Sequence, residues 1–215
     1  MFSIQLNNKK TIEIESIKNN YLINVSNRLP IHYNGGIKKS AGGLVSAFED
    51  IVNEHQFKWF GWAGKFAKTE AEKIAIKNQL NTLNYNPIFL DKTQIDAYYD
   101  GFCNSSLWPL FHYFPTHYHY QHEWFLHYQT VNQLFCDTLA KEAPKESSVW
   151  IHDYHLLLLP HLLKEKRPDL KIAFFLHLQY WTDVHDKTLN NISAWRCFPI
   201  MKTRFQVNIK STFIQ

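Results

Sequence analysis

The sequence predicts an α/β fold built around a parallel β-sheet, and the segment 149–177 carries most of that prediction. Short apolar runs at 149–151 and 172–176 flank a leucine-rich pattern with helical spacing at 155–166, and Arg167-Pro168 ends the helix. Uninterrupted apolar runs are typical of strands buried on both faces of a parallel sheet. Similar runs alternate with helical patterns upstream, as expected for strands that helices connect.

The first part of the chain supplies two strands and two helices. Residues 21–25 predict a buried strand that Pro30 takes out of the sheet, and apolar positions from Leu44 onward keep helical spacing. Residues 57–64 predict a second strand, which ends in a glycine-flanked tryptophan. A surface helix is expected over 69–80, with four residues facing inward: Ala71, Ile74, Ala75 and Ile76.

The same alternation continues toward the segment 149–177. Residues 86–90 predict another strand, and the stretch 95–114 is dense in aromatic and polar residues. Residues 123–140 predict a long helix that packs through one face, formed by Trp124, Tyr128, Val131, Phe135 and Leu139. Pro144 and a polar turn close that helix.

Composition excludes several functional classes. A chain of 215 residues has room for one large α/β domain or at most two small ones. The formal charge of +4 is spread along the chain, which does not indicate nucleic-acid binding. All seven glycines lie between Gly35 and Gly101, so the segment 149–177 lacks the glycines with which a dinucleotide-binding turn approaches phosphates.

Cysteine usage and hydropathy bear on localisation. Cys103, Cys136 and Cys197 lie far apart without metal-type spacing, which indicates reduced thiols in a reducing compartment. The first twenty residues lack the apolar core of a signal peptide, and no apolar run approaches membrane-spanning length. We therefore expect a cytoplasmic protein without a membrane or nucleic-acid partner.

Residues at predicted strand ends are the first candidates for a site. Asp153 and His177 follow neighbouring strands, and open α/β sheets bind ligands at the carboxyl ends of strands. Arg28 is either a solvated loop charge or a ligand for an anion. Gly42-Gly43 precedes a predicted helix, where a phosphate or sugar could reach backbone amides. Trp62 is either a platform under a sugar ring or part of the core.

A second group of candidates is aromatic. Tyr98-Tyr99, Asn104 and Trp108-Pro109 cluster in one short stretch, which is more than a core requires. Five histidines follow, with spacings of five, two, three and five that fit neither a helix face nor a zinc pattern: His112, His117, His119, His122 and His127. No metal site is expected there.

Six motifs in order carry a resemblance to a known family. They are Val25-Ser26-Asn27-Arg28-Leu29-Pro30, Gly42-Gly43-Leu44, Trp59-Phe60-Gly61-Trp62, Tyr98-Tyr99 through Asn104 to Phe111-His112-Tyr113, Val149 to Leu158, and Phe174-Phe175-Leu176-His177. Over about residues 20–177 the chain resembles the N-terminal half of trehalose-6-phosphate synthase, glycosyltransferase family 20. The resemblance implies a Rossmann-like parallel sheet flanked by helices, the N-terminal half of the two-domain GT-B fold.

The resemblance also implies an activity. In the family, glucose passes from UDP-glucose to glucose 6-phosphate, which gives α,α-trehalose 6-phosphate and UDP with retention and without a metal or other cofactor. Front-face displacement, thought to operate there, needs no carboxylate nucleophile, so the lack of a carboxylate pair in this chain is no objection.

Individual residues match the family's site. Residues around the acceptor sugar phosphate match Arg28, Trp62, Tyr99 and Trp108. Gly43 matches a residue by the donor phosphates. Asp153 matches an aspartate that hydrogen-bonds hydroxyls in the reaction centre, and His177 matches a histidine near the donor glucose.

After His177 the sequence departs from the family pattern. The family continues with a proline-rich stretch and a second domain that holds the nucleotide, whereas this chain reads Leu178-Gln179-Tyr180-Trp181. We expect a prefix at 1–19, an acceptor-side domain at 20–177 and a divergent tail at 178–215, without the nucleotide-sugar domain.

That organisation leaves three functional alternatives. The first is the synthase, which we expect to be catalytically incomplete in this chain alone. In the GT-B fold the substrates react between two domains that close over them. The second is a non-catalytic sugar-phosphate-binding or regulatory subunit that associates with full-length synthase or phosphatase subunits. The third is a truncated product without function.

Overall fold

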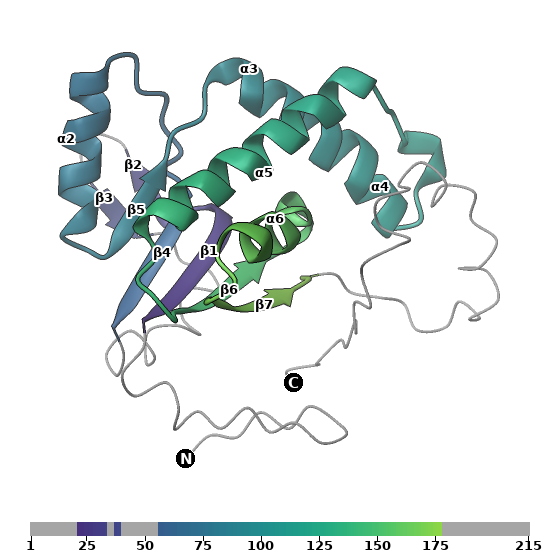
Figure 1. The fold of residues 1–215 in the computed structure, drawn as a ribbon. Helices are drawn as coiled ribbons and strands as arrows, with labels where there is room; N and C mark the ends of the chain where they lie inside the picture. The colour runs from purple at the N-terminus through teal and green to yellow at the C-terminus, as the bar shows by residue number, and fades with distance from the viewer. Residues whose placement is uncertain (1–20, 34–36, 40–55, 178–215) are drawn as a thin grey trace. The chain divides into compact units, whose positions relative to one another are not determined.

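A computed structural model describes residues 21–33, 37–39 and 56–177 (Figure 1). The chain divides into two units, Met1–Phe175 and Leu176–Gln215. All described helices and strands belong to the first unit. None of these helices combines the length and the hydropathy that a membrane crossing requires. The helix predicted from Leu44 lies outside the described residues.

The first unit is organised around a five-stranded parallel sheet with the order β5-β4-β1-β6-β7. Its strands are β1 (Leu22–Arg28), β4 (Phe57–Trp62), β5 (Tyr85–Ile88), β6 (Ser148–His152) and β7 (Lys171–Phe175). A separate antiparallel pair consists of β2 (Ile31–Tyr33) and β3 (Ile37–Lys39). The predicted parallel α/β sheet is confirmed.

The order of the strands reverses at β1. The chain adds β4 and β5 on one side of β1, and then β6 and β7 on the other. Right-handed crossovers therefore place α2 (Glu70–Asn81) on one face of the sheet and both α5 (His122–Glu142) and α6 (Leu159–Lys166) on the other. Figure 1 shows α5 and α6 together, with α2 apart from them. Such a reversal is where doubly wound sheets bind ligands, at the carboxyl edge.

The centre of the sheet is closely packed. Ile23 and Val25 on β1 are fully buried, while Leu22 joins the cluster on the α2 face. On neighbouring β4, a Cβ atom at Gly61 would lie only 2.8 Å from the Ser26 carbonyl oxygen and 2.9 Å from the Leu29 nitrogen. Because main-chain atoms cannot move aside without breaking the strand pairing, only glycine fits at this position.

Two expected details of burial are wrong. The inward stripe of α2 consists of Ile76 and Leu80, whereas Ala71 and Ala75 are exposed and Ile74 is 59% exposed. Of the four residues expected to face inward, only Ile76 does so. Strand β7 is half-buried rather than fully buried, because it lies at the end of the described sheet and pairs there with β6 alone.

The long helix between β5 and β6 is confirmed, and its surroundings are less regular than the sequence indicated. The buried face of α5 includes Tyr128, Val131, Phe135 and Leu139. Before it, residues Ile95–Leu107 form η2, a helix with i→i+5 hydrogen bonding, between the short α3 (Lys92–Gln94) and α4 (Trp108–Phe111). Such π-helical geometry is rare and often marks functional sites.

The segment after β6 begins with a tight turn. A helix was expected from His155, but Tyr154–Leu156 form the 3₁₀ turn η4, and α6 begins at Leu159. The phenol of Tyr128 on α5 donates to the Tyr154 carbonyl at 2.8 Å and accepts from the Leu157 nitrogen at 3.0 Å. Burial raises the pKa of Tyr128 well above its ordinary value, so this hydroxyl keeps its proton.

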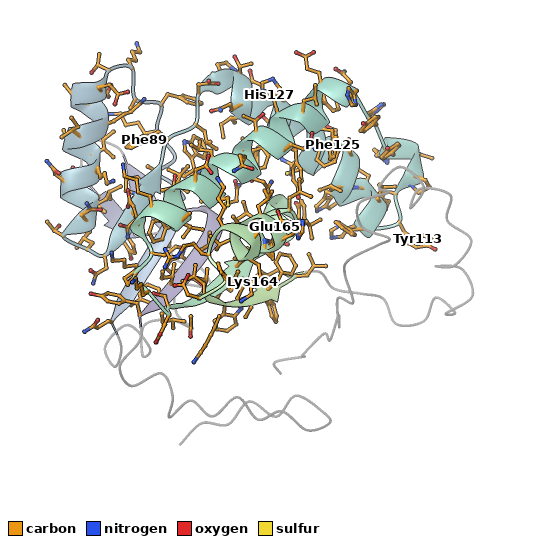
Figure 2. The ribbon with its side chains drawn as sticks, in the orientation of Figure 1. Phe89, Tyr113, Phe125, His127, Lys164 and Glu165 are labelled. Carbon is orange, nitrogen blue, oxygen red and sulfur yellow. The ribbon has the colours of Figure 1, made fainter. Side chains whose placement is uncertain are left out.

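Replacing the Tyr128 hydroxyl should weaken this turn. In Tyr128→Phe the Tyr154 carbonyl and the Leu157 amide lose a buried partner, so we expect the free energy of unfolding to fall by about 1–3 kcal/mol. Chemical denaturation measures the change. The matched control is Tyr113→Phe, because Tyr113 is 49% exposed and projects outward from the turn after α4 (Figure 2). Equal stability of the two variants would contradict this role of Tyr128.

Candidate functional site

The carboxyl edge of the sheet brings several predicted site residues to neighbouring strand ends. Arg28 ends β1 and Trp62 ends β4, and the two residues are paired in register. Asp153 directly follows β6, the other neighbour of β1. His177 is exposed, follows β7 by two residues and belongs to the second unit. Gly43 lies outside the described residues. The described site is therefore built from the first unit alone.

Arg28 and Trp62 form one half of the site. The Cζ atom of Arg28 lies 5.4 Å from the centroid of the Trp62 ring, a cation–π contact. Within the described part of the chain, no carboxylate pairs with this guanidinium. The Trp62 ring also packs on Phe66, with 5.7 Å between centroids. An exposed guanidinium that stacks over an aromatic ring can bind an anion.

The two tryptophans of β4 have different roles, as alternation along a strand requires. Trp59 is buried and donates from Nε1 to the Ser26 hydroxyl at 2.8 Å, so it belongs to the core. Trp62 is half-buried at the strand end. Its Nε1 atom is buried without a hydrogen-bond partner among the described residues. Of the two rings, only Trp62 is placed to meet a ligand at the carboxyl edge.

Asp153 has a main-chain conformation that is normally reserved for glycine. Its φ of 74° and ψ of 165° fall in a region that side chains avoid, at a cost of about 1–3 kcal/mol. Two hydrogen bonds hold Asp153 in this conformation. Its backbone nitrogen donates to the Phe175 carbonyl at 2.8 Å, and its side-chain Oδ1 atom accepts from the Tyr154 nitrogen at 2.9 Å. Strain of this kind concentrates at functional sites.

A histidine that the sequence reasoning passed over lies beside Asp153. The His155 ring stacks on Tyr154 at 4.2 Å and on Tyr99 at 5.5 Å between centroids. Its Nδ1 atom is 3.9 Å from Asp153 Oδ2, beyond hydrogen-bond distance, and has no partner among the described residues. The His155 ring thus lies between Tyr99 and the carboxylate of Asp153. In the sequence, only the position of His155 two residues after Asp153 could have indicated that it lies at the site.

Burial keeps the His155 imidazole neutral. The side chain is removed from water, and this desolvation lowers the pKa of His155 from 6.5 to about 4. At neutral pH the imidazole therefore carries no charge, although it lies close to a carboxylate. A neutral ring between two tyrosines can donate or accept one hydrogen bond without competing with Arg28 for an anion.

Tyr98 joins the two halves of the site. Its buried hydroxyl lies 2.9 Å from Oδ1 of Asn27, next to Arg28, and 3.3 Å from the His155 carbonyl. Asn132 on α5 donates to the same carbonyl at 3.2 Å. Burial raises the pKa of Tyr98 well above its ordinary value, so the phenol stays protonated. The end of β1 and the turn after β6 are thus held together across the point where the strand order reverses.

Trp108 lies in a different cluster from Arg28 and Asp153. It is 39% exposed, and its described ring contacts are with His112 at 4.2 Å and Phe114 at 5.8 Å. Those contacts bring it to neither Trp62 nor Tyr99. The described residues include no group of three or more histidine, cysteine or acidic side chains that could hold a metal ion.

The neutral His155 makes stability depend on pH. Its folded-state pKa of about 4 lies below the ordinary 6.5, so on acidification the unfolded chain takes up this proton first. The contribution is present above pH 6.5 and is lost as pH falls toward 4. We expect the slope of unfolding free energy against pH in this window to be shallower in His155→Gln by up to about 1.4 kcal/mol per pH unit.

Denaturant titrations at several pH values measure this slope. The matched control is His119→Gln, because His119 is exposed. The control should keep the slope of the unchanged protein. A His155→Gln slope that equals the control's would contradict a buried, neutral His155.

The chain is similar to known proteins both in sequence and in structure. The family model described as glycosyltransferase family 20 matches residues 16–188. A relative from Saccharomyces cerevisiae, the 56 kDa subunit of α,α-trehalose-phosphate synthase (UDP-forming), is 36% identical over 180 residues, which cover 78% of this chain and 36% of the relative. The chain spans about a third of the length of the curated relatives it matches.

Two solved structures are also similar. One is an α,α-trehalose-phosphate synthase (UDP-forming) from Burkholderia xenovorans in complex with glucose-6-phosphate, with a TM-score of 0.56 and 29% identity, covering 73% of this chain and 33% of that chain. The other is a trehalose-6-phosphate protein from E. coli bound with UDP-2-fluoro glucose, with a TM-score of 0.62 and 27% identity, covering 83% of this chain and 37% of that chain.

These likenesses settle the fold and the family. The parallel sheet and its helices form the N-terminal Rossmann-like half of a GT-B glycosyltransferase. The family model covers most of the sequence. The chain belongs to glycosyltransferase family 20.

Proposed function

We propose that this chain is the acceptor-side part of an α,α-trehalose-phosphate synthase (UDP-forming) and binds glucose 6-phosphate at the carboxyl edge of its sheet. The observation that carries the proposal is the exposed Arg28 guanidinium, held over Trp62 at the edge that also carries Asp153. A sugar phosphate carries a phosphate that Arg28 can bind and hydroxyls that can donate to Asp153. The similarity to a synthase in complex with glucose-6-phosphate supports this reading.

Each candidate residue then has a chemical role. Arg28 binds the acceptor phosphate, and the rings of Trp62 and Tyr99 line the acceptor site. Trp108, whose described ring contacts are with His112 and Phe114, is assigned to that site by the family resemblance alone. Asp153 accepts hydrogen bonds from sugar hydroxyls in the reaction centre. His177 and Gly43 belong to the donor side, near the glucose and the phosphates of UDP-glucose.

The proposed reaction needs no group beyond its two substrates. The bond between the donor glucose C1 and the UDP oxygen breaks, and C1 forms a bond to the acceptor hydroxyl oxygen on the same face. The proton of that hydroxyl passes to the leaving phosphate of UDP. The protein contributes alignment of donor with acceptor and exclusion of water, and neither a metal nor a covalent intermediate takes part.

Domain organisation and location follow from the same proposal. The acceptor domain spans 20–177, with a prefix at 1–19 and a tail at 178–215. The protein works in the cytoplasm, on sugar phosphates. The alternative is a non-catalytic sugar-phosphate-binding or regulatory subunit of a synthase or phosphatase complex, which the subunit name of the Saccharomyces relative favours.

Binding of the acceptor tests the proposal directly. We expect calorimetry to detect glucose 6-phosphate binding to the folded chain, and Arg28→Ala to weaken it about tenfold or more, because a charge-assisted hydrogen bond is lost. The matched control is Lys58→Ala, which removes a cation of β4 that lies over the Tyr21 ring. No heat at millimolar ligand, with folded protein, would exclude the binding function.

Turnover distinguishes the synthase from a binding subunit. With UDP-glucose and glucose 6-phosphate, we expect no UDP release by the purified chain above that of Asp153→Ala, because the chain spans about a third of the length of the synthases it matches. Release above this control would show that the chain is catalytically complete. Recovery of UDP release on addition of a full-length synthase partner that is inactive alone would favour the subunit role.

The strained main chain of Asp153 predicts opposite effects on stability and on binding. In Asp153→Gly the backbone strain of about 1–3 kcal/mol disappears, so the protein should unfold at a higher temperature. The carboxylate is also lost, so glucose 6-phosphate should bind more weakly. Asp153→Asn is the control that keeps the strain. Thermal unfolding and calorimetry measure both effects, and a glycine variant less stable than the asparagine variant would contradict the strain argument.

A further inference from the structure

Gly64 lies against the guanidinium of Arg28. The residue follows the end of β4 by two positions and has a φ of 77°, where side chains are disfavoured. A Cβ atom at Gly64 would lie 2.5 Å from Nη2, 2.8 Å from Nε and 2.9 Å from Cζ of Arg28. All three distances are shorter than real Cβ contacts. The guanidinium therefore occupies the space that any side chain at position 64 would need.

The two closest atoms matter for recognition. Nε and Nη2 form one edge of the guanidinium, and their two N–H groups can donate in parallel to two oxygens of a phosphate. A methyl group at position 64 would lie against this edge and push the guanidinium away from its place over Trp62. The displaced group would keep its charge and lose its fixed orientation.

Gly64 and Gly61 differ in what surrounds them. A Cβ atom at Gly61 would meet main-chain atoms of β1, which cannot yield. At Gly64 the atoms within reach belong to the end of a long, exposed side chain, which can swing into solvent. Substitution at 64 is thus compatible with folding, and its effect falls on the position of Arg28.

We propose that Gly64 is a positioning residue for the acceptor phosphate, a role that rests on the proposed binding of glucose 6-phosphate. Its missing side chain lets the Arg28 guanidinium remain over the Trp62 ring with its donors fixed. The pair determines the preference for a phosphorylated sugar over a neutral one, because only the phosphate uses these donors. Glucose itself relies on hydroxyl contacts elsewhere at the edge.

A double-mutant cycle tests this role with four proteins: the unchanged chain, Gly64→Ala, Arg28→Ala and the double variant. Calorimetry measures the affinity of each for glucose 6-phosphate and for glucose, and thermal unfolding measures stability. We expect Gly64→Ala to weaken glucose 6-phosphate binding about tenfold, as loss of an oriented charge-assisted hydrogen bond does, and to leave glucose binding unchanged. In the Arg28→Ala background the same substitution should have no further effect on binding.

The stability arm separates contact from strain. Alanine at a φ of 77° is strained in either background, whereas the clash with the guanidinium exists only when Arg28 is present. Gly64→Ala should therefore lower the melting temperature more in the unchanged chain than in Arg28→Ala. An equal loss of melting temperature in both backgrounds would contradict the contact between Gly64 and the Arg28 guanidinium.

The remaining outcomes are also decisive. Unchanged glucose 6-phosphate affinity in Gly64→Ala would overturn the positioning role while the proposed function stands. Equal weakening of glucose and glucose 6-phosphate would show a general disturbance of the site and would also overturn it. If the unchanged, folded chain binds neither ligand, the proposed function fails and the positioning role fails with it, although the stability arm still decides whether the two residues touch.

Discussion

The turn that follows β6 is the constraint on which the site depends. Asp153 can keep a glycine-like main chain only because the residues after it are fixed by buried donors from helices on one face of the sheet. Tyr128 and Asn132 reach the turn from α5, and Tyr98 reaches it from η2. Each of these bonds is buried, where an unmade partner is costly, so the helices and the turn stabilise one another.

The same network holds together residues that are far apart in the sequence but lie at one edge of the sheet. Asn27 and His155 are separated by more than half the chain, yet both lie within reach of the Tyr98 hydroxyl. Parallel strands end at one edge, and the reversal at β1 leaves the ends of β1 and β6 adjacent. The fold thus supplies proximity, and three buried polar side chains supply the orientation.

Much of this architecture could be predicted from the sequence. Apolar runs, Pro30 and Pro168 define strands and helix ends through local physics, and the strand-end rule placed Asp153 and Arg28 correctly. The π-helical η2, the strained conformation of Asp153 and the fit of Arg28 to Gly64 could not be predicted, because each depends on contacts between distant segments. Periodicity also misjudged Ile74, because an apolar spacing shows which residues share a helix face and not how much of that face the sheet covers. The functional roles of all seven candidate site residues stay predictions, and Gly43 also lies outside the described residues.

The His155 ring keeps the same charge state through mild acidification. A guanidinium keeps its proton throughout the physiological range, and an imidazole with a pKa near 4 does not gain one there. Cellular acidification to pH 6 would thus leave the His155 ring neutral, while a phosphate monoester, whose second ionisation lies near that pH, would lose part of its charge. A loss of phosphate binding in mild acid would then come from protonation of the ligand and not from protonation of His155.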